Sequence, residues 1–259
     1  MILKDIINII ESAAPLKWQE EWDNSGLQVG ERNAEIHSVL LTTDVTEAVV
    51  AEAIERGCDL IISHHPLLYK GLKSLTGSTP QERCVEQAIR HGIAIYSAHT
   101  SMDNYLEGVS GRMAKKLGVQ NYRLLVTQTG EYGLGVIGRL PEPILFTDFL
   151  ERVRTVFGAG YIRYTQPLQE RVQTIAMCGG AGAEFAEAAI EQGAEVFLSA
   201  DFKYHTMQAL NGRIAAVDID HWVSEHFTRE IFAELIGKAV PTYIAASDSS
   251  PVKVYQAQN

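Results

Sequence analysis

Five residues of types that bind metal ions follow three short apolar segments of the sequence. His64 and His65 come directly after DLIIS, Asp103 lies shortly after IAIY, and the pair His221 and Glu225 follows RIAAV. In open α/β sheets, ligands gather at the carboxyl ends of the strands. Imidazole and carboxylate groups together suit Zn, Fe or Mn. The three segments therefore predict a metal site.

The adjacent histidines indicate more than one metal ion. Side chains of neighbouring residues at a strand end point apart, so His64 and His65 suit two separate metals better than one. The alternative is a pair of surface histidines. Placement after a buried strand and before the rigid Pro66 favours metal binding.

The segment SAHTSMD contains two further candidates. Asp103 can bridge two cations, as carboxylates commonly do. Its alternative role is an N-cap of the predicted helix VSGRMAKKLG, although it lies early for that. His99 binds substrate, carries a proton or orients a ligand, and the alternative is a hydrogen-bonded core histidine.

His221 and Glu225 are four residues apart at the opening of a predicted helix that continues as SEHFTREIFAELIG. That spacing places both side chains on one helix face. The arrangement is similar to helical His/Glu ligand pairs without being the HExxH motif. A solvated surface pair is the alternative.

A fourth polar segment, DFKYH, follows the apolar VFLSA. Lys203 and His205 can meet an anionic substrate or move protons. Asp201 has a similar substrate role or, alternatively, is the N-cap of the predicted helix YHTMQALNG.

The elements that position these residues alternate between strand and helix. SVLLTTDV, EAVVAEAIERG, DLIIS, QERCVEQAIRHG and IAIYSAH follow one another, which predicts α/β lobes with mainly parallel sheets flanked by helices. Residues 53–63 (AIERGCDLIIS) also match residues 189–199 (AIEQGAEVFLS), and SVLLTTD matches TIAMCGG at the same offset.

The repeat predicts two similar lobes, residues 1–125 and 126–259, with the metal site in the cleft between them. We expect the lobes to be intertwined, with the C-terminal helix completing the shared site. YGLGVIGRL and the helical TDFLERVRTVFG belong to neither copy and are expected to pad the second lobe.

Composition limits the classes of function. The 259 residues are 46% apolar and 21% charged, as in a globular protein, and the net charge of −10 argues against nucleic acid as a partner. No apolar run approaches the roughly 20 residues of a membrane span, and the N-terminus predicts an amphipathic helix, so we expect a cytoplasmic protein. The three cysteines are scattered without a CxxC pair, which argues against disulfides or a cysteine zinc site.

With these motifs in place, the sequence resembles the GTP cyclohydrolase I type 2 homologues, also called Ngg-interacting-factor-three-like proteins. The likeness runs along nearly the whole chain. It includes WDNSGLQVG, TTDVTEAVV, DLIISHHPLLYKGL, SAHTSMD, LSADFKYH and DIDHWVSE. One departure is Ala200, where the family usually has glycine before the aspartate.

The resemblance implies two related α/β lobes, a toroidal homohexamer and a dinuclear metal centre. Its metal ligands fall on His64, His65, Asp103, His221 and Glu225. The implied reaction is opening of the GTP imidazole ring by metal-bound hydroxide, with release of formate.

In that reaction His99 or His205 would carry protons, and Lys70, Lys73 or Lys203 would meet the triphosphate of a small anionic nucleotide. Two alternatives share the same ligands. One is a metal-dependent phosphoesterase acting on nucleotides, and the other is a metal-binding interaction or regulatory protein without turnover.

Overall fold

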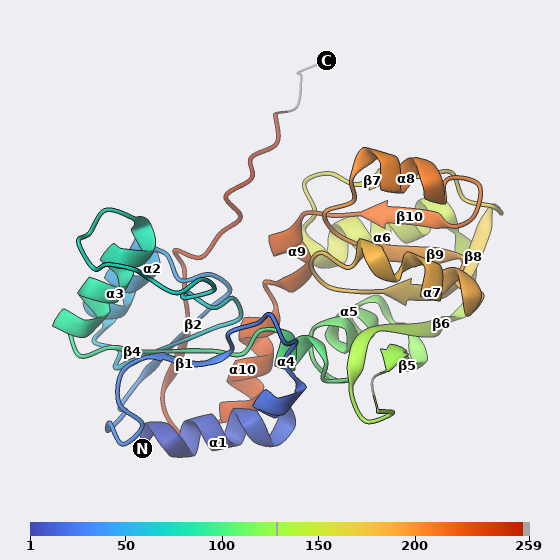
Figure 1. Ribbon diagram of the computed structural model, residues 1–259. Coiled ribbons are helices and arrows are strands. Elements are labelled where there is room, and N and C mark those ends of the chain that lie inside the picture. Colours follow the sequence, from blue (N-terminus) through green and yellow to red (C-terminus); the bar gives the residue numbers. More distant parts are fainter. Residues whose placement is uncertain (128, 256–259) are drawn as a thin grey trace. The chain divides into compact units, whose positions relative to one another are not determined.

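The computed structural model describes residues 1–127 and 129–255, which form two compact units. The first unit comprises Met1–Asn104 and His226–Ser249, and the second comprises Tyr105–Glu225 and the described residues from Ser250 onward. Each unit contains its own sheet (Figure 1). The chain therefore passes between the units three times.

This division differs from a single boundary after residue 125. The segment from Tyr105 belongs to the second unit because its strand β5 (Gln120–Thr127) pairs with β6 (Gly133–Leu145). The segment from His226 belongs to the first unit because its strand β11 (Thr242–Ile244) pairs with β2 (Val39–Thr42).

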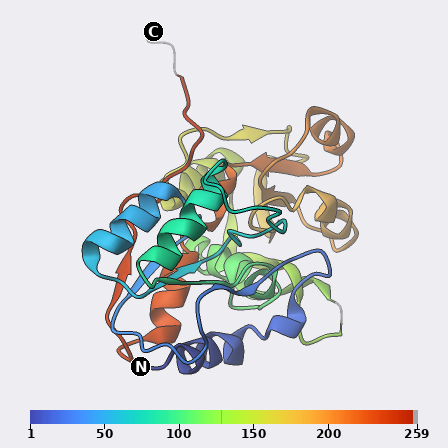
Figure 2. The ribbon, with the colours of Figure 1, turned by 60° about the vertical axis from the view of Figure 1, so that its left-hand side comes forward.

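The first unit is a sheet in the order β1-β4-β3-β2-β11, parallel except for β1. Helices α2 and α3 lie side by side on one face, and α1 contacts α10 on the other (Figures 1 and 2). Its remaining elements are α1 (Leu3–Ala13), η1 (Leu16–Trp18), β1 (Gly26–Val29), α2 (Glu47–Arg56), β3 (Leu60–Ser63), α3 (Pro80–Arg90), β4 (Ala94–Ser97), α4 (Thr100–Asp103) and α10 (Thr228–Ile236).

The second unit is a sheet in the order β5-β6-β8-β9-β10-β7. Only β8, β9 and β10 are parallel, so this sheet is mixed. The segments expected to belong to neither repeat copy form β6, which pairs antiparallel with β5 and β8, and α6, which contacts β6 and β8. Its remaining elements are α5 (Val109–Leu117), α6 (Phe146–Phe157), β7 (Arg163–Tyr164), β8 (Arg171–Met177), η2 (Ala183–Phe185), α7 (Ala186–Glu191), β9 (Val196–Ser199), α8 (Tyr204–Leu210), β10 (Ala215–Asp218) and α9 (His221–Glu225).

The predicted repeat is confirmed in the pairing of the strands. Leu60 of β3 pairs with Val39 of β2, and Val196 of β9 pairs with Ile175 of β8. Both pairs are parallel, and the second is displaced from the first by 136 residues along the chain (175 − 39 and 196 − 60). The two strand–helix–strand segments therefore share topology and register.

The repeat extends to a pair of carboxylates. Asp59 accepts hydrogen bonds from the backbone N–H groups of residues 37 and 38, which directly precede β2. Glu195, at the matching position, accepts from residues 173 and 174. Each carboxylate ties the beginning of one strand to the beginning of its neighbour.

Local sequence sets the helix ends in the first unit. The Thr46 and Thr79 hydroxyls accept from the third residue beyond each of them, Val49 and Glu82, and so cap α2 and α3. Gly57 ends α2 in the left-handed region (φ +64°), which glycine adopts without steric cost. The cysteines 58, 84 and 178 are buried, and none of them forms a disulfide.

Within the described chain, none of the helices is both long and apolar enough to cross a membrane.

Candidate metal centre

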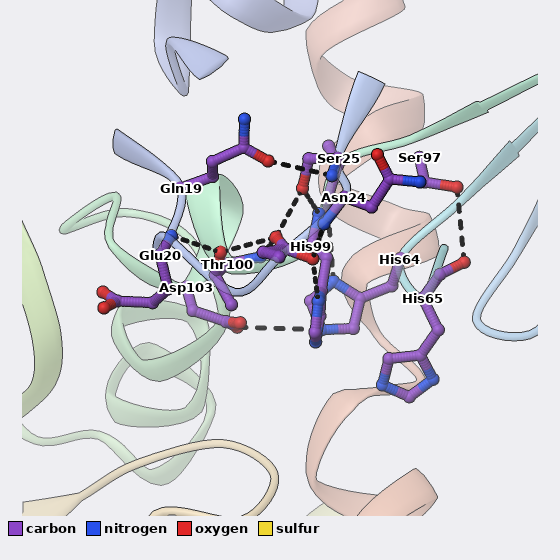
Figure 3. A network of polar contacts seen from close by, with 12 residues as sticks. Gln19, Glu20, Asn24, Ser25, His64, His65, Ser97, His99, Thr100 and Asp103 are labelled. Carbon is purple, nitrogen blue, oxygen red and sulfur yellow. Dashed lines mark hydrogen bonds and ion pairs between the residues drawn. The ribbon is translucent and has the colours of Figure 1, made fainter. Parts of the chain in front are cut away.

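The first unit gathers three histidines at the carboxyl ends of adjacent strands. His64 and His65 follow β3, and His99 follows β4 (Figure 3). Ring centroids are 4.9 Å apart for His64 and His65, and 5.3 Å from each of these to His99. One ring nitrogen of each lies within 4.8 Å of the others. We call these residues the histidine cluster.

His64 and His65 are oriented through Nδ1. His64, whose side chain is fully buried, has Nδ1 3.1 Å from the Ala98 carbonyl oxygen. His65 has Nδ1 2.8 Å from Oδ1 of Asp44. Metal-binding histidines commonly donate one ring N–H to a carbonyl or carboxylate and bind through the other nitrogen. Both rings therefore present Nε2 as the ligand atom.

Asp103 lies beside His64, as the ligand prediction requires. Its Oδ1 atom is 3.7 Å from His64 Nε2 (Figure 3). With metal–ligand bonds near 2.1 Å, two ligands of one ion stand about 3–3.5 Å apart, so the pair fits a metal after a small contraction. Asp103 ends α4, and α5 begins at Val109 with Gly108 as its N-cap, so the alternative N-cap role is wrong.

His99 is held by a buried aspartate. Asp23 Oδ1 is 2.8 Å from His99 Nδ1, and Asp23 Oδ2 accepts from Ser25 and from Thr100. Burial alone would raise the pKa of Asp23, but the hydrogen bonds from His99, Thr100 and Ser25 hold it well below its usual value. The carboxylate therefore stays charged and fixes the His99 ring with Nδ1 toward Asp23.

The second unit holds the pair His221 and Glu225 on α9. His221 Nε2 is 3.0 Å from Glu225 Oε2, which confirms that the i, i+4 spacing brings the two together. The Glu225 side chain is 4% exposed, which a solvated surface pair does not explain. His221 Nδ1 is 2.8 Å from Asp201 Oδ2, so this ring is also oriented through Nδ1.

Asp201 is not the N-cap of α8. Helix α8 is preceded by Lys203 and has no side-chain cap. Asp201 has φ +58°, a left-handed conformation that few residues other than glycine adopt. That backbone is compatible with the contact between its carboxylate and His221. The neighbouring Ala200 is fully buried, and its N–H bonds the Gly180 carbonyl, so its methyl group is accommodated.

Gly180 makes room for the Glu225 carboxylate. A Cβ atom at residue 180 would stand 2.1 Å from Glu225 Oε1 and 3.3 Å from His221. The Gly180 N–H also donates to the Ser224 hydroxyl at 2.9 Å, which ties α9 to the end of β8. Any side chain at residue 180 would displace Glu225.

The predicted long helix from His221 is wrong in one respect. It divides into α9 and α10, with His226 and Phe227 between them. The break coincides with the passage of the chain from the second unit to the first.

Three other predicted site residues lie outside these clusters. His205 is exposed on α8, with Nδ1 3.3 Å from Gln208, and belongs to none of the potential ligand groups found among the described residues. Lys203 is exposed before α8, and Lys70 is exposed in the loop after Pro66. Their substrate roles stay predictions.

The roles of Asp23, Asp44 and Gly180 were missed from the sequence. Asp44 ends the strand segment SVLLTTD just before the capping Thr46, and an acidic residue at a strand end is a usable signal. Gly180 stands at the position of the second repeat copy that matches Asp44. Asp23 acts from a loop, where hydrophobic period gives no signal.

Comparisons with known proteins agree on one family. A family model described as Duf34/NIF3 (NGG1p interacting factor 3) matches residues 1–251. A Streptococcus pneumoniae protein is 33% identical over 91% of this chain and 90% of its own length. A Lactococcus lactis protein is 32% identical over 100% of this chain and 96% of its own. Both are named GTP cyclohydrolase 1 type 2 homolog, which confirms the resemblance drawn from the sequence.

Solved structures confirm the fold class. The crystal structure of Staphylococcus aureus protein SA1388 has a TM-score of 0.90 at 24% identity, covering 98% of this chain and 99% of that one. Reduced HcgD from Methanocaldococcus jannaschii has a TM-score of 0.80 at 27% identity, covering 94% and 97%.

Proposed function

We propose a function from the premise that this chain belongs to the Duf34/NIF3 (NGG1p interacting factor 3) family. The protein is a dinuclear metal-dependent hydrolase that opens the imidazole ring of GTP. Its metal ligands are His64, His65, Asp103, His221 and Glu225. The names of the relatives support the GTP reaction, since they describe homologues of GTP cyclohydrolase 1 type 2.

One observation carries the metal part of the proposal. Three histidines, His64, His65 and His221, each have Nδ1 against an oxygen acceptor. Two of these rings have Nε2 within 4 Å of a carboxylate oxygen, from Asp103 and Glu225. This is the arrangement that proteins use to fix the tautomer and orientation of metal-binding histidines.

We assign the ligands of both units to one centre. The support is the family resemblance, which implies one dinuclear centre with these five ligands. Five ligands also exceed what one tetrahedral ion uses. Two bound divalent ions would activate water and polarise the carbon that is attacked.

The chain's own residues supply the proton transfer and the binding of phosphate. Asp23 holds His99 through Nδ1, so Nε2 of His99 is the atom that accepts or donates a proton during ring opening. Lys70 and Lys203, both exposed, meet the triphosphate as flexible cations. His205 is the second candidate for proton transfer.

The test begins with metal content. Apoprotein reconstituted with Zn, Mn or Fe(II) and freed of excess metal should hold close to two equivalents per chain. Saturation at one equivalent would contradict the dinuclear centre. The loaded protein should then convert GTP to formate and a ring-opened product. Hydrolysis of phosphoesters without opening of the GTP ring would identify a phosphoesterase. Metal binding without any turnover would identify a metal-binding protein.

We also propose that the chain forms a homohexamer, as the family resemblance implies. Light scattering should give a mass near six times the 28.6 kDa of one chain. A monomer at micromolar concentration would contradict this assembly.

A further inference from the structure

Two exposed aromatic side chains adjoin the histidine cluster. Trp22 is 57% exposed and Tyr69 is 48% exposed. Their ring centroids are 6.0 Å apart, and Trp22 is 5.8 Å from the ring of His99. Scattered exposed aromatics are common, but a contiguous pair beside a candidate centre calls for a role.

The backbone next to Trp22 is held in place by a buried side chain. It precedes Asp23, whose side chain is fully buried and accepts hydrogen bonds from Ser25 and Thr100 as well as contacting His99. The position of the indole is therefore tied to the same carboxylate that orients His99. A preorganised aromatic loses little conformational entropy when a ligand contacts it.

The segment that holds Tyr69 is fastened to the segment that holds Trp22. The Asn24 side chain donates to the Leu68 carbonyl at 2.6 Å, and the Leu68 N–H donates to Gln28 at 3.0 Å. Both bonds are made by Leu68, the residue before Tyr69, and so hold the backbone of Tyr69 beside the segment of Trp22.

The contacts of Trp22 leave room for a flat ligand. The plane of its indole ring makes angles of 65° with the ring of Tyr69 and 70° with that of His99, so both contacts are T-shaped and neither ring stacks on Trp22. A stacked neighbour would cover a whole ring face. More than half of the indole residue instead faces solvent.

We infer that Trp22 and Tyr69 form an aromatic subsite that stacks a planar heteroaromatic ring of the substrate next to His99. The inference rests on the proposed function and adds to it the residues that would hold the flat heterocycle of the substrate, such as a purine. Every such ring has a π-face, so stacking selects flatness and leaves the choice among bases to other contacts. Lys70, next to Tyr69 in the chain, adds a positive charge for an attached phosphate.

Binding by metal-loaded protein tests the subsite without requiring turnover. Guanosine supplies the ring without phosphates, and inorganic triphosphate supplies the charge without a ring. Stacking of one base is worth about 1–3 kcal/mol, so Trp22→Ala should weaken guanosine binding about 5–150-fold. Triphosphate binding should change less than about twofold. Trp22→Phe should restore most of the guanosine affinity, and Tyr69→Ala should give a smaller loss.

Tyr243→Ala is the matched control, since Tyr243 is a 41% exposed aromatic of the same unit on β11. It should leave both ligands unaffected, and all variants should keep the wild-type metal content. Guanosine affinity that is unchanged in Trp22→Ala, that falls equally with triphosphate affinity, or that is absent in the wild type would overturn the subsite. If the wild type releases no formate from GTP but Trp22→Ala still weakens guanosine binding, the subsite is upheld and only the proposed reaction is rejected.

Discussion

The two units have the same strand–helix–strand frame but place different chemistry at matching strand ends. In the first unit Asp44 holds His65. At the matching positions of the second unit stand Gly180, which makes room for Glu225, and Asp201, which holds His221 from α9. His65 is thus matched by a carboxylate, Asp201, and the carboxylate of Asp44 is matched by glycine. Duplication preserved the backbone register, while the residues just beyond the strands diverged.

The strongest way to break this comparison is to remove the ligand that Gly180 accommodates. Glu225→Gln keeps the volume of the side chain and removes its charge. We expect metal affinity to fall at least about 10–100-fold, taking the loss from mutations of supporting residues as a floor. Hydrolytic activity should fall with it, while folding survives because the α/β core does not depend on a metal.

Metal titration with a chromophoric chelator measures this effect, and circular dichroism checks the fold. Glu230→Gln on α10 is a control for the general loss of one charge. Unaltered stoichiometry and affinity in Glu225→Gln would remove Glu225 from the centre and weaken the case for His221.

The two orienting carboxylates should behave alike although they occupy different repeat positions. Asp44→Asn and Asp201→Asn each leave a weaker acceptor at Nδ1 of their histidine. We expect each to lower metal affinity about tenfold, the smaller end of the range for such supporting residues. A loss in one variant only would show that the two histidines are not equivalent in ligation.

Glu52 tests a feature that the first unit alone possesses, since the matching residue of the repeat is Ala188. Burial disfavours the Glu52 carboxylate, but hydrogen bonds from Ser247, Ala246 and Arg56 outweigh it and lower its pKa to about 2. Glu52→Gln should therefore reduce the free energy of unfolding at pH 7 by about 1–2 kcal/mol.

Because the folded pKa lies below the unfolded value of 4.5, the stabilisation is complete above that pH and is lost as pH falls toward 2. Denaturant unfolding at pH 7 and pH 3 should show a smaller difference between wild type and Glu52→Gln at the lower pH. A difference independent of pH would contradict the linkage.

The smallest expected effect is on the free energy of unfolding, and it should be nearly equal in the two units. Asp59→Asn and Glu195→Gln each weaken two charge-assisted hydrogen bonds at the start of a strand. Each should cost about 1 kcal/mol, and the two losses should agree within about 0.5 kcal/mol. Unfolding curves measure both, and clearly unequal losses would show that the frames are not equivalent in energy.

Much of this architecture could be predicted because local signals agree with the fold. Apolar strands, the capping Thr46 and Thr79, and the repeat offset identify the frame. The pair His221 and Glu225 was also predictable from helical spacing. Asp23 was not, because a loop has no period and its partner His99 lies 76 residues away along the chain. Intertwining of the lobes was expected, but the bounds of the exchanged segments were not predicted, because strand pairing across such separations leaves no local trace.

The interleaved chain has a consequence for the order of folding during synthesis. All strands of the second sheet lie between residues 120 and 218, so that sheet is complete once the ribosome has released residue 225. The first sheet still lacks β11 at that moment, and its face lacks α10. We therefore expect the half of the protein that is translated first to be finished last.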